Sequence, residues 1–410
     1  MDNLQQNDTY WKKVVWVLCF GWIAIWIYRT ILNPLLPLLK TEFGIESDAT
    51  IGLISTAYFF GYTAMQIPSG ILADKVGRKK IMIPGFLLFA IGPILIGVTP
   101  IFSLVIIASV IAGIGSGAYY GTAYATSSET IPEEKRGFST AIINSGSAVG
   151  MTIGLLGASW FVLDMGFNWR ILLFISAAII VVMAIVFGLV LKEKPRSKNV
   201  KETNKEDAED KVSLKVLLSE SRILSAYLLY FATCYAYYMI VTWLPAFLQQ
   251  ERGFEGSAIG LASSLVAIAA IPGALIFSKF SDMYANKKLS FIISLEIAVV
   301  LVVFLIVTVT QNWLVVAMLI LYGLLGKLAV EPILISHMST IAPKKGYGTF
   351  FGFFNFFGMS SSIVAPFLTG LIADATGSRV IAFYIAAVIL IIAIIFFAIA
   401  NRKKTTGIAA

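Results

Sequence analysis

The run Gly70-Ile-Leu-Ala-Asp74-Lys75-Val-Gly77-Arg78-Lys79-Lys80 places a compact charged turn between two long apolar segments. These charges cannot lie in hydrocarbon, so we expect the flanking segments to be membrane helices joined by a tight aqueous loop. Within this loop, Gly70 should allow close helix approach and Gly77 should permit a sharp turn. Asp74 should lie at the positive N-terminal end of a neighbouring helix, with Arg78 nearby as its partner.

The composition indicates a polytopic membrane protein. The 410 residues are 58% hydrophobic and only 13% charged, whereas soluble domains average about 25% charged residues. The net charge of +8 does not indicate a nucleic-acid partner, because the basic residues are spread over many short loops. No nucleophile, metal-ligand cluster or cofactor loop is recognisable. We therefore expect a lipid-embedded monomer that binds no nucleic acid, metal or cofactor and is not an enzyme.

Twelve segments meet the requirement of about 20 mostly apolar residues for a bilayer crossing. In order they are Val14–Leu39, Ile51–Ser69, Ile81–Val98, Phe102–Thr126, Phe138–Leu163, Ile171–Leu191, Ile223–Leu248, Ala258–Phe280, Leu289–Thr310, Trp313–Ile341, Thr349–Ile372 and Val380–Ala400. The first is a membrane helix rather than a signal peptide, because no small-residue cleavage pattern follows Lys12-Lys13.

A charge-dense stretch divides these segments six plus six. We predict an N-terminal bundle over 1–191, a cytoplasmic linker over 192–221 and a C-terminal bundle over 222–410. With the N-terminus inside, 25 of 31 basic residues lie on the cytoplasmic side, since four fall outside and two within the membrane (31 − 4 − 2). The positive-inside rule then places both termini in the cytoplasm of a plasma-membrane protein.

The two halves repeat each other. The spacing from Pro132 to Asn144 and from Pro343 to Asn355 is twelve residues in both cases (144 − 132 and 355 − 343). The segment Asp282–Lys288 is a decayed copy of the opening run and lies between the eighth and ninth segments, where a second copy should occur. A parallel duplication is the simplest explanation.

The opening run resembles the signature of the major facilitator superfamily, G-x-L-A-D-[RK]-x-G-[RK]-[RK]-[RK], and matches it at every defined position. The resemblance implies an all-α fold of twelve helices in two six-helix bundles, with alternating access between them. It further implies that the first, fourth, seventh and tenth helices face the transport pathway, and that the opening run acts as a conformational gate. The alternative is an ordinary positive-inside loop.

Further segments are similar to the anion:cation symporter family, which moves sugar acids and carboxylates, usually with protons. They are Gly113–Tyr120, Pro132–Gly137, Asn168–Arg170 and Thr242–Pro245. The chain departs from that family where Tyr28 precedes Arg29 in place of an aspartate, where Ser116 replaces an acidic residue, and where Ser109 replaces an arginine. The anion anchor is therefore present while the usual proton carriers are missing, which leaves either relocated proton coupling or anion exchange.

Two cations lie in pathway helices. Arg29 in the first helix and Lys327 in the tenth would each cost about 2.5–3.5 kcal/mol if they faced lipid, so they should face a cavity or a partner. We predict that both hold an anionic substrate, Arg29 through its planar fork. Glu331, four residues after Lys327, should pair with it and is the coupling candidate, because its protonation would free Lys327. The alternative for both cations is a structural ion pair or a snorkelling side chain.

The remaining polar candidates are weaker. Tyr120 and Tyr238 could offer hydroxyl groups to the substrate, although aromatic side chains at helical spacing are more often core. Asn144 and Asn355 occupy matching repeat positions and could bind a neighbouring helix or the substrate. Glu296 in the ninth helix has a structural or partner-facing role as an equal alternative to transport.

The sequence thus predicts a secondary transporter of a small organic anion, with proton symport as the first expectation and anion exchange as the alternative. A transporter of a neutral solute or drug is a second alternative, in which Arg29 pairs internally. A non-transporting sensor on the same fold is a third, but no appended signalling domain supports it.

Overall fold

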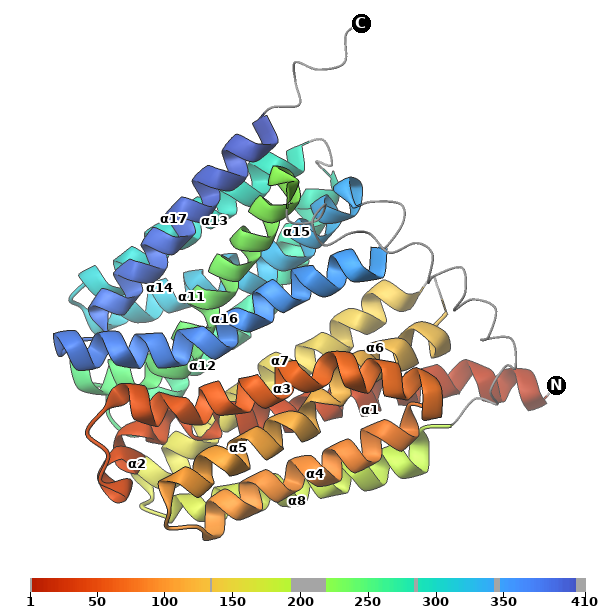
Figure 1. Ribbon diagram of the computed structural model, residues 1–410, viewed down its shortest axis with the longest axis horizontal. Helices are drawn as coiled ribbons and strands as arrows, with labels where there is room; N and C mark the ends of the chain where they lie inside the picture. The colour runs from red at the N-terminus through yellow and green to blue at the C-terminus, as the bar shows by residue number, and fades with distance from the viewer. Residues whose placement is uncertain (1, 133–134, 193–218, 284–286, 343–346, 403–410) are drawn as a thin grey trace, which may run out of the picture. The chain divides into compact units, whose positions relative to one another are not determined.

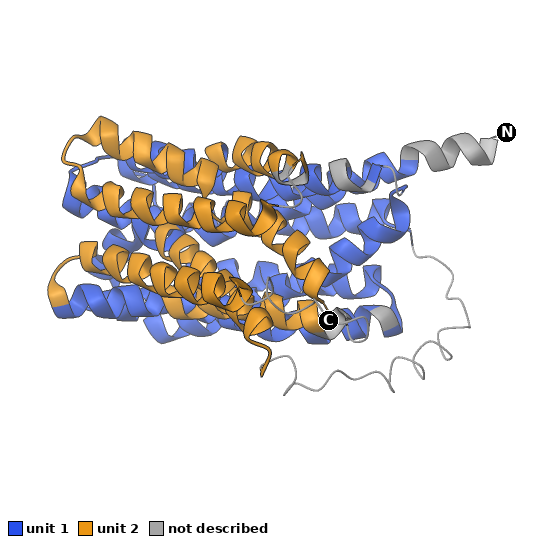
Figure 2. Ribbon diagram, turned by 90° about the horizontal axis from the view of Figure 1, so that it is seen from above, with its two compact units in different colours: residues 1–193, 241–268, 366–375 blue, residues 194–240, 269–365, 376–410 orange. Residues whose placement is uncertain are grey.

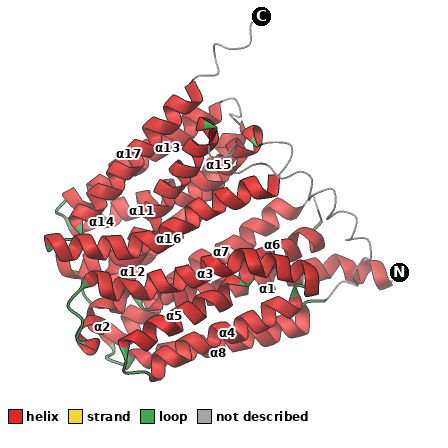
Figure 3. Ribbon diagram, viewed as in Figure 1, coloured by secondary structure: helices red, strands yellow, loops and turns green. Residues whose placement is uncertain are grey.

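The computed structural model describes residues 2–132, 135–192, 219–283, 287–342 and 347–402. These residues form helices joined by short connections, with no strand among them (Figure 3). Most of the predicted linker, residues 193–218, lies outside the described residues, as do Pro343 of the repeat and the residues between Met283 and Lys287.

The helices follow the predicted segments closely (Figure 1). In the first half they are α1 (Asp2–Ile31), η1 (Asn33–Leu35), α2 (Leu36–Phe43), α3 (Asp48–Val76), α4 (Lys79–Val98), α5 (Phe102–Gly117), α6 (Tyr119–Thr130), α7 (Arg136–Ala158), η3 (Ser159–Asp164) and α8 (Trp169–Val190). In the second half they are α11 (Ser221–Arg252), α12 (Ser257–Met283), α13 (Lys288–Thr308), α14 (Asn312–Leu325), α15 (Lys327–Ile341), α16 (Tyr347–Thr376) and α17 (Val380–Arg402).

Eleven helical segments of the described chain are long and apolar enough to cross a bilayer. They correspond to eleven of the twelve predicted crossings, and α3 is the exception. With 29 residues α3 is long enough, but its tyrosines, threonines and Gln66 lower its hydropathy. A crossing helix of mixed polarity can avoid lipid only by turning its polar side chains toward protein or a cavity. The all-helical membrane fold predicted from the sequence is confirmed.

Three predicted crossings are interrupted rather than continuous. The first changes to the short helix η1 around Pro34, which has no N–H to donate. The fourth breaks at Ala118, between α5 and α6. The tenth breaks at Gly326, whose extended backbone (φ −74°, ψ −153°) makes Lys327 the first residue of α15. This break places a cation at the positive end of a helix, where it needs compensation.

Glycines allow α7 to lie directly against α1. Gly146, Gly150 and Gly154 follow one another at intervals of one turn, and a Cβ added at each would collide with atoms of α1. Without a hydrophobic driving force between helices in lipid, such close backbone contact is a main source of helix association. The row of glycines therefore fixes α1, and with it Arg29, against the fifth crossing.

The chain forms two compact units, drawn in blue and orange in Figure 2. The first unit comprises Met1–Glu193, Val241–Ile268 and Pro366–Ala375, and the second comprises Lys194–Ile240, Ala269–Ala365 and Thr376–Ala410. The first unit thus contains the six crossings of the N-terminal half together with one end each of α11, α12 and α16. In the first unit α4 lies between α5 and α8, and in the second α13 packs against α14 and α17 (Figure 1).

Within the first unit, at the end opposite the Gly70–Lys80 run, two carboxylates cap helices from the other half of the sequence. Asp374 of α16 accepts hydrogen bonds from the backbone N–H groups of Asp48 and Ala49, at 2.6 and 2.9 Å, where α3 begins. Asp164, which ends η3, accepts one from the backbone N–H of Ser257 at 3.0 Å, where α12 begins. Both carboxylates satisfy N–H groups that have no partner within their helix and face the positive end of its dipole.

The two caps are related by the internal repeat. Asp374 follows Asp164 by 210 residues (374 − 164), and Asn355 follows Asn144 by 211 (355 − 144). The fifth crossing of each half therefore caps the second crossing of the other half. This exchange supports the parallel duplication predicted from the Pro–Asn spacing.

Replacing either capping aspartate by asparagine should lower the melting temperature of the purified protein, because a cap contributes about 1 kcal/mol. We expect Asp374→Asn to cost more than Asp164→Asn, since Asp374 also accepts a hydrogen bond from the Ser47 hydroxyl at 2.6 Å. Glu255→Gln is the matched control, because Glu255 is exposed beside the start of α12 and its side chain makes no described contact. Equal melting temperatures for all three variants would contradict the caps.

Candidate functional site

Arg29 is held inside the first unit by a chain of polar contacts. Its Nε donates a hydrogen bond to the Tyr58 hydroxyl at 2.9 Å. The same hydroxyl lies 2.7 Å from Oγ of Ser116. Because Arg29 donates to its oxygen, Tyr58 can donate its own hydrogen to Ser116. The serine that replaces an acidic residue of the symporter family therefore contacts the arginine indirectly, through Tyr58.

Aromatic rings surround the guanidinium group. Its central carbon lies 4.2 Å from the ring centroid of Tyr62, 5.0 Å from that of Trp26 and 5.3 Å from that of Phe59. We call the full set the aromatic cage; its members are Trp22, Trp26, Tyr58, Phe59 and Tyr62. The negative faces of such rings attract a cation, more strongly where water is excluded. The cage explains how Arg29, in the last turn of α1, remains within the first crossing without snorkelling to an interface.

A small pocket, with room for about one water molecule, opens beside this group. Arg29 lines it together with Asn33, Ser55 and Tyr58. The amide of Asn33 donates to the carbonyl oxygen of Val241 at 2.8 Å, which ties the break after α1 to α11. As predicted from the cost of a charge in lipid, Arg29 faces a cavity and protein partners.

The structure connects the other N-terminal candidates to the same cage. The ring of Tyr120 packs against Trp22 with centroids 6.1 Å apart, and against Tyr124 with centroids 4.8 Å apart. The Tyr124 hydroxyl in turn donates a hydrogen bond to the side-chain oxygen of Asn144, which is exposed. Arg29, Tyr120 and Asn144 are thus linked through two aromatic residues that the sequence did not single out for this role.

The opening run forms the expected turn, and Arg78 forms an ion pair with a residue of the fourth crossing. Gly77 has φ +107°, a conformation that other residues rarely adopt. Arg78 pairs with Glu129, where the fourth crossing ends, at 2.5 Å. The expected partner was Asp74, whose side chain lies outside the described residues. A Cβ added at Gly70 would meet no heavy atom within 4 Å, but one added at Gly121 of α6 would lie 3.8 Å from the Cα of Gly70, so α6 passes close to the backbone at Gly70.

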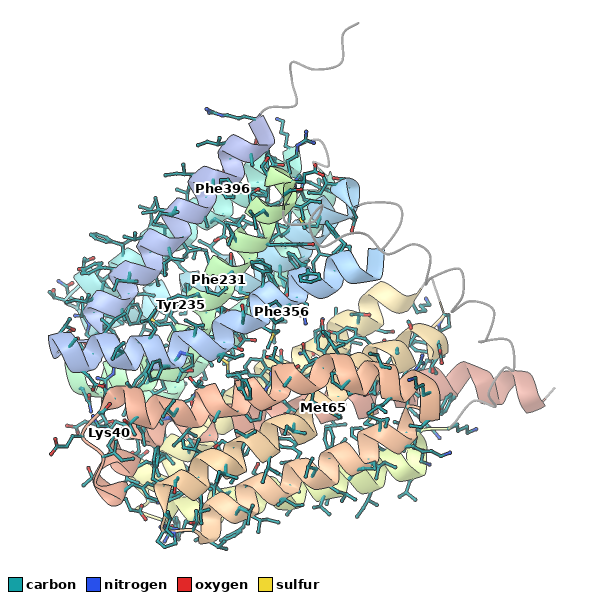
Figure 4. All side chains as sticks on the ribbon, in the orientation of Figure 1. Lys40, Met65, Phe231, Tyr235, Phe356 and Phe396 are labelled. Carbon is teal, nitrogen blue, oxygen red and sulfur yellow. The ribbon has the colours of Figure 1, made fainter. Side chains whose placement is uncertain are left out.

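In the second unit, Lys327 and Glu331 form the predicted ion pair. Nζ of Lys327 donates to one carboxylate oxygen of Glu331 at 2.7 Å, and the Tyr230 hydroxyl donates to the other. The lysine side chain is only 11% exposed and lies 5.8 Å from the ring centroid of Tyr230 and 5.6 Å from that of Tyr237. Figure 4 labels Phe231 and Tyr235 on the same part of α11. The pair compensates the cation at the start of α15.

Tyr230 is held in place by α16. Its ring stacks on Phe354 with centroids 4.0 Å apart, and a Cβ added at Gly358 would collide with it. Of the two remaining candidates in this half, Tyr238 is buried, with its hydroxyl 3.6 Å from the sulfur of Met359, and Asn355 is half-buried on α16. Tyr238 also lies close enough to Lys327 to interact with its charge, so this candidate borders the polar site of Lys327 and Glu331.

Glu296 of α13 does not face the lipid or a partner protein. The side chain is completely buried, and it is hydrogen-bonded to the Thr233 hydroxyl of α11. Tyr58 and Tyr230, which bind Arg29 and Glu331, were both missed by sequence reasoning. For Tyr58 a signal existed, because the tyrosines of α3 interrupt an otherwise apolar crossing helix.

Comparison with known proteins agrees with this architecture. The sequence model of the Major Facilitator Superfamily matches residues 18–366. The chain is 23% identical over 389 residues to the hexuronate transporter of Bacillus subtilis, covering 91% of this chain and 90% of that protein. It is 26% identical over 400 residues to the multidrug resistance protein MdtG of Proteus mirabilis, covering 94% and 96%.

A solved structure shares the fold. A bacterial homologue of the human lysosomal transporter Spinster, in an inward-facing and occupied conformation, superimposes with a TM-score of 0.80. The match covers 96% of this chain and 97% of that chain at 16% sequence identity. At this identity the likeness concerns the fold alone.

The ion pair of the second unit, whose lysine and glutamate side chains are 11% and 25% exposed, can be measured by a double-mutant cycle. Lys327→Gln should destabilise the protein by about 1–3 kcal/mol, because it leaves the Glu331 carboxylate with Tyr230 as its remaining described donor. Adding Glu331→Gln should restore part of that loss. The control is the more exposed pair of Glu42 with Arg170, whose side chains are 33% and 25% exposed and whose cycle should give about 0–1 kcal/mol. Additive effects for Lys327 and Glu331 in unfolding experiments would contradict a coupled pair.

Proposed function

The chain belongs to the major facilitator superfamily, and we propose that it moves a small organic anion, a carboxylate or sugar acid, across the membrane by alternating access. The observation that carries this proposal is the arrangement around Arg29. A permanently charged guanidinium group lies inside a membrane bundle and borders a pocket. A cation placed there at considerable cost, on a helix of the expected pathway, favours a substrate of opposite charge.

The chemistry of Arg29 suits a carboxylate. Its planar group presents donors in a fork that matches two carboxylate oxygens. One donor, Nε, is directed to Tyr58, which fixes the orientation of the fork. Two rings of the aromatic cage, Tyr58 and Phe59, line the pocket and could contact the carbon skeleton of a sugar acid. The likeness to a hexuronate transporter supports the same substrate class.

Lys327 supplies a second cation, and we assign it the same anion during the transport cycle. In the described structure Lys327 is engaged by Glu331. Substrate binding at Lys327 therefore requires that Glu331 be protonated or displaced. This competition would link anion binding to a second ion, as the spacing of the two residues predicted.

The membrane potential makes such a link necessary for accumulation. Importing one negative charge against 100 mV, inside negative, costs about 2.3 kcal/mol. A co-transported proton or an exchanged anion removes this cost. We propose proton symport in a plasma-membrane protein with both termini in the cytoplasm, and anion exchange is the alternative.

A second candidate function is transport of a neutral or drug-like molecule, which the similarity to a multidrug resistance protein favours. In that case the Arg29 contacts would serve only to hold the bundle together. Neutral analogues belong in every binding panel for this reason.

Binding measurements on Arg29 variants test the anion proposal. In purified protein, D-glucuronate should raise the melting temperature in proportion to its affinity, and uncharged D-glucose should not. Arg29→Ala should abolish the shift. Arg29→Lys should weaken binding about tenfold or more, because a charge-assisted hydrogen bond of the fork is lost while the charge remains.

The control for that series is Arg170→Lys, which alters an arginine paired with Glu42 away from the cage. It should leave binding unchanged. A glucose response, or equal glucuronate responses in wild type and Arg29→Ala, would favour the neutral-substrate function.

Glu331→Gln tests the predicted link to protons. If Glu331 carries the coupling proton, removing the negative charge that holds Lys327 should make anion binding stronger and independent of pH. Uptake of D-glucuronate into liposomes, driven by an imposed pH gradient, should then fall while exchange across the membrane continues. If pH-driven accumulation is unchanged in Glu331→Gln, Glu331 does not couple transport to protons.

A further inference from the structure

A second carboxyl group of the same unit has the surroundings of a proton-binding site. Glu296 lies on α13, is completely buried, and faces α11. Its contact with Thr233 lies one turn of α11 away from the contact between Tyr230 and Glu331. The two glutamates therefore approach the same stretch of α11 from different helices, and they do so in different chemical settings.

The number of hydrogens available for hydrogen bonding distinguishes the surroundings of Glu296 from those of Glu331. The Thr233 hydroxyl has one hydrogen but two neighbours, the carbonyl oxygen of Leu229 at 2.9 Å and a carboxyl oxygen of Glu296. A carbonyl oxygen can only accept. If Thr233 donates to Leu229, the second contact is a hydrogen bond only when Glu296 supplies the hydrogen. A protonated Glu296 satisfies both contacts, and an ionised one satisfies a single contact.

The other oxygen of Glu296, Oε2, is buried and has no hydrogen-bond partner among the described residues. No basic side chain of the described chain lies within ion-pair distance of Glu296. An ionised carboxylate in such a place would need several donors to offset the loss of water. Glu331 has them, because Lys327 and Tyr230 both donate to it.

The groups that face Glu296 are otherwise neutral or already paired. Cys234 from α11 and Tyr322 from α14 lie close enough to interact with its charge. From α15 the charged side chains are Lys327 and Glu331, which bind each other. The helix α17 contributes Tyr384, which packs on Phe304, about two turns farther along α13.

We propose that Glu296 is the site that binds the coupling proton. It carries the proton in the structure described here, and it releases that proton to water when α11 moves and Thr233 no longer accepts its hydrogen bond. The step breaks the carboxyl O–H bond and leaves a carboxylate. This proposal rests on the proposed anion transport, which it deepens by naming the coupled ion and where it binds.

The electrostatic consequence gives the direction of coupling. With Glu296 protonated, Lys327 and Glu331 leave the cluster with no net charge. Ionisation of Glu296 adds a negative charge to the bundle that contains Lys327, which disfavours an anion there. Proton binding at Glu296 and anion binding at Lys327 must then strengthen each other by the same factor, because linkage between two sites is reciprocal.

Infrared difference spectroscopy during a pH titration tests the proton site without any substrate. Purified wild-type protein should lose the carbonyl stretching band of a buried protonated carboxyl group as the pH rises. Glu296→Gln should lack this band, and the matched variant Glu331→Gln should retain it. Thr233→Val keeps the carboxyl group but removes its partner, so the band should shift in frequency. A band that persists in Glu296→Gln, or that is absent from wild type at every pH, overturns the proposal.

Transport then tests coupling, with D-glucuronate as the probe. A gradient of one pH unit should drive about tenfold accumulation in wild type if one proton accompanies each anion. Glu296→Gln, which resembles the protonated side chain in shape and charge, should exchange D-glucuronate as wild type does but accumulate none. Accumulation by Glu296→Gln at the wild-type level overturns the proposal. If wild type shows the infrared band but neither accumulates nor exchanges D-glucuronate, the proposed function fails for this probe while the proton site stands.

Discussion

A charged side chain in the hydrocarbon region must find its compensation inside the protein, and this requirement governs the arrangement of both units. Three ionisable residues of the crossing helices meet it differently. Arg29 uses aromatic faces and the Tyr58 hydroxyl, and Lys327 uses the carboxylate of Glu331. Among the described residues Glu296 has Thr233 alone as a hydrogen-bond partner, which suffices for a neutral carboxyl group and not for an ionised one. The number of available donors thus distinguishes a permanent charge from a titrating one.

The compensating groups could not approach without space created by glycine. In the first half a Cβ on Gly146 would lie 3.1 Å from Cβ of Trp22, and in the second a Cβ on Gly358 would collide with the ring of Tyr230. Both aromatic residues lie 5.8 Å from the cation of their own unit. The two halves therefore share an arrangement rather than identical residues. In each half a glycine on the fifth crossing leaves space for an aromatic ring on the first crossing, and that ring contacts the cation of the same half.

Sequence reasoning succeeded where the interaction is local. The lengths of the apolar runs predicted the membrane-crossing helices. The i, i+4 spacing predicted the contact of Lys327 with Glu331, because side chains four residues apart lie on the same face of a helix. It failed where partners come from different helices. Tyr58 reaches Arg29 from the second crossing, and Tyr230 reaches Glu331 from the seventh. Which face of a helix meets which neighbour depends on packing, so the hydropathy that identified α13 as a crossing could not reveal that Glu296 faces α11.

The contacts at the two ends of the first unit are of a kind suited to reversible closure. At one end Arg78 pairs with Glu129 while partly exposed, and at the other Asp164 and Asp374 cap helices from exposed positions. Each such contact contributes about 0.3–1 kcal/mol in water, and its separated groups can be solvated again at little cost. A large apolar seal would hold one state too firmly, since reversing a 99:1 preference requires about 5.5 kcal/mol of differential binding. Weak and polar contacts of this kind can be broken and formed again at a cost that differential ligand binding can supply.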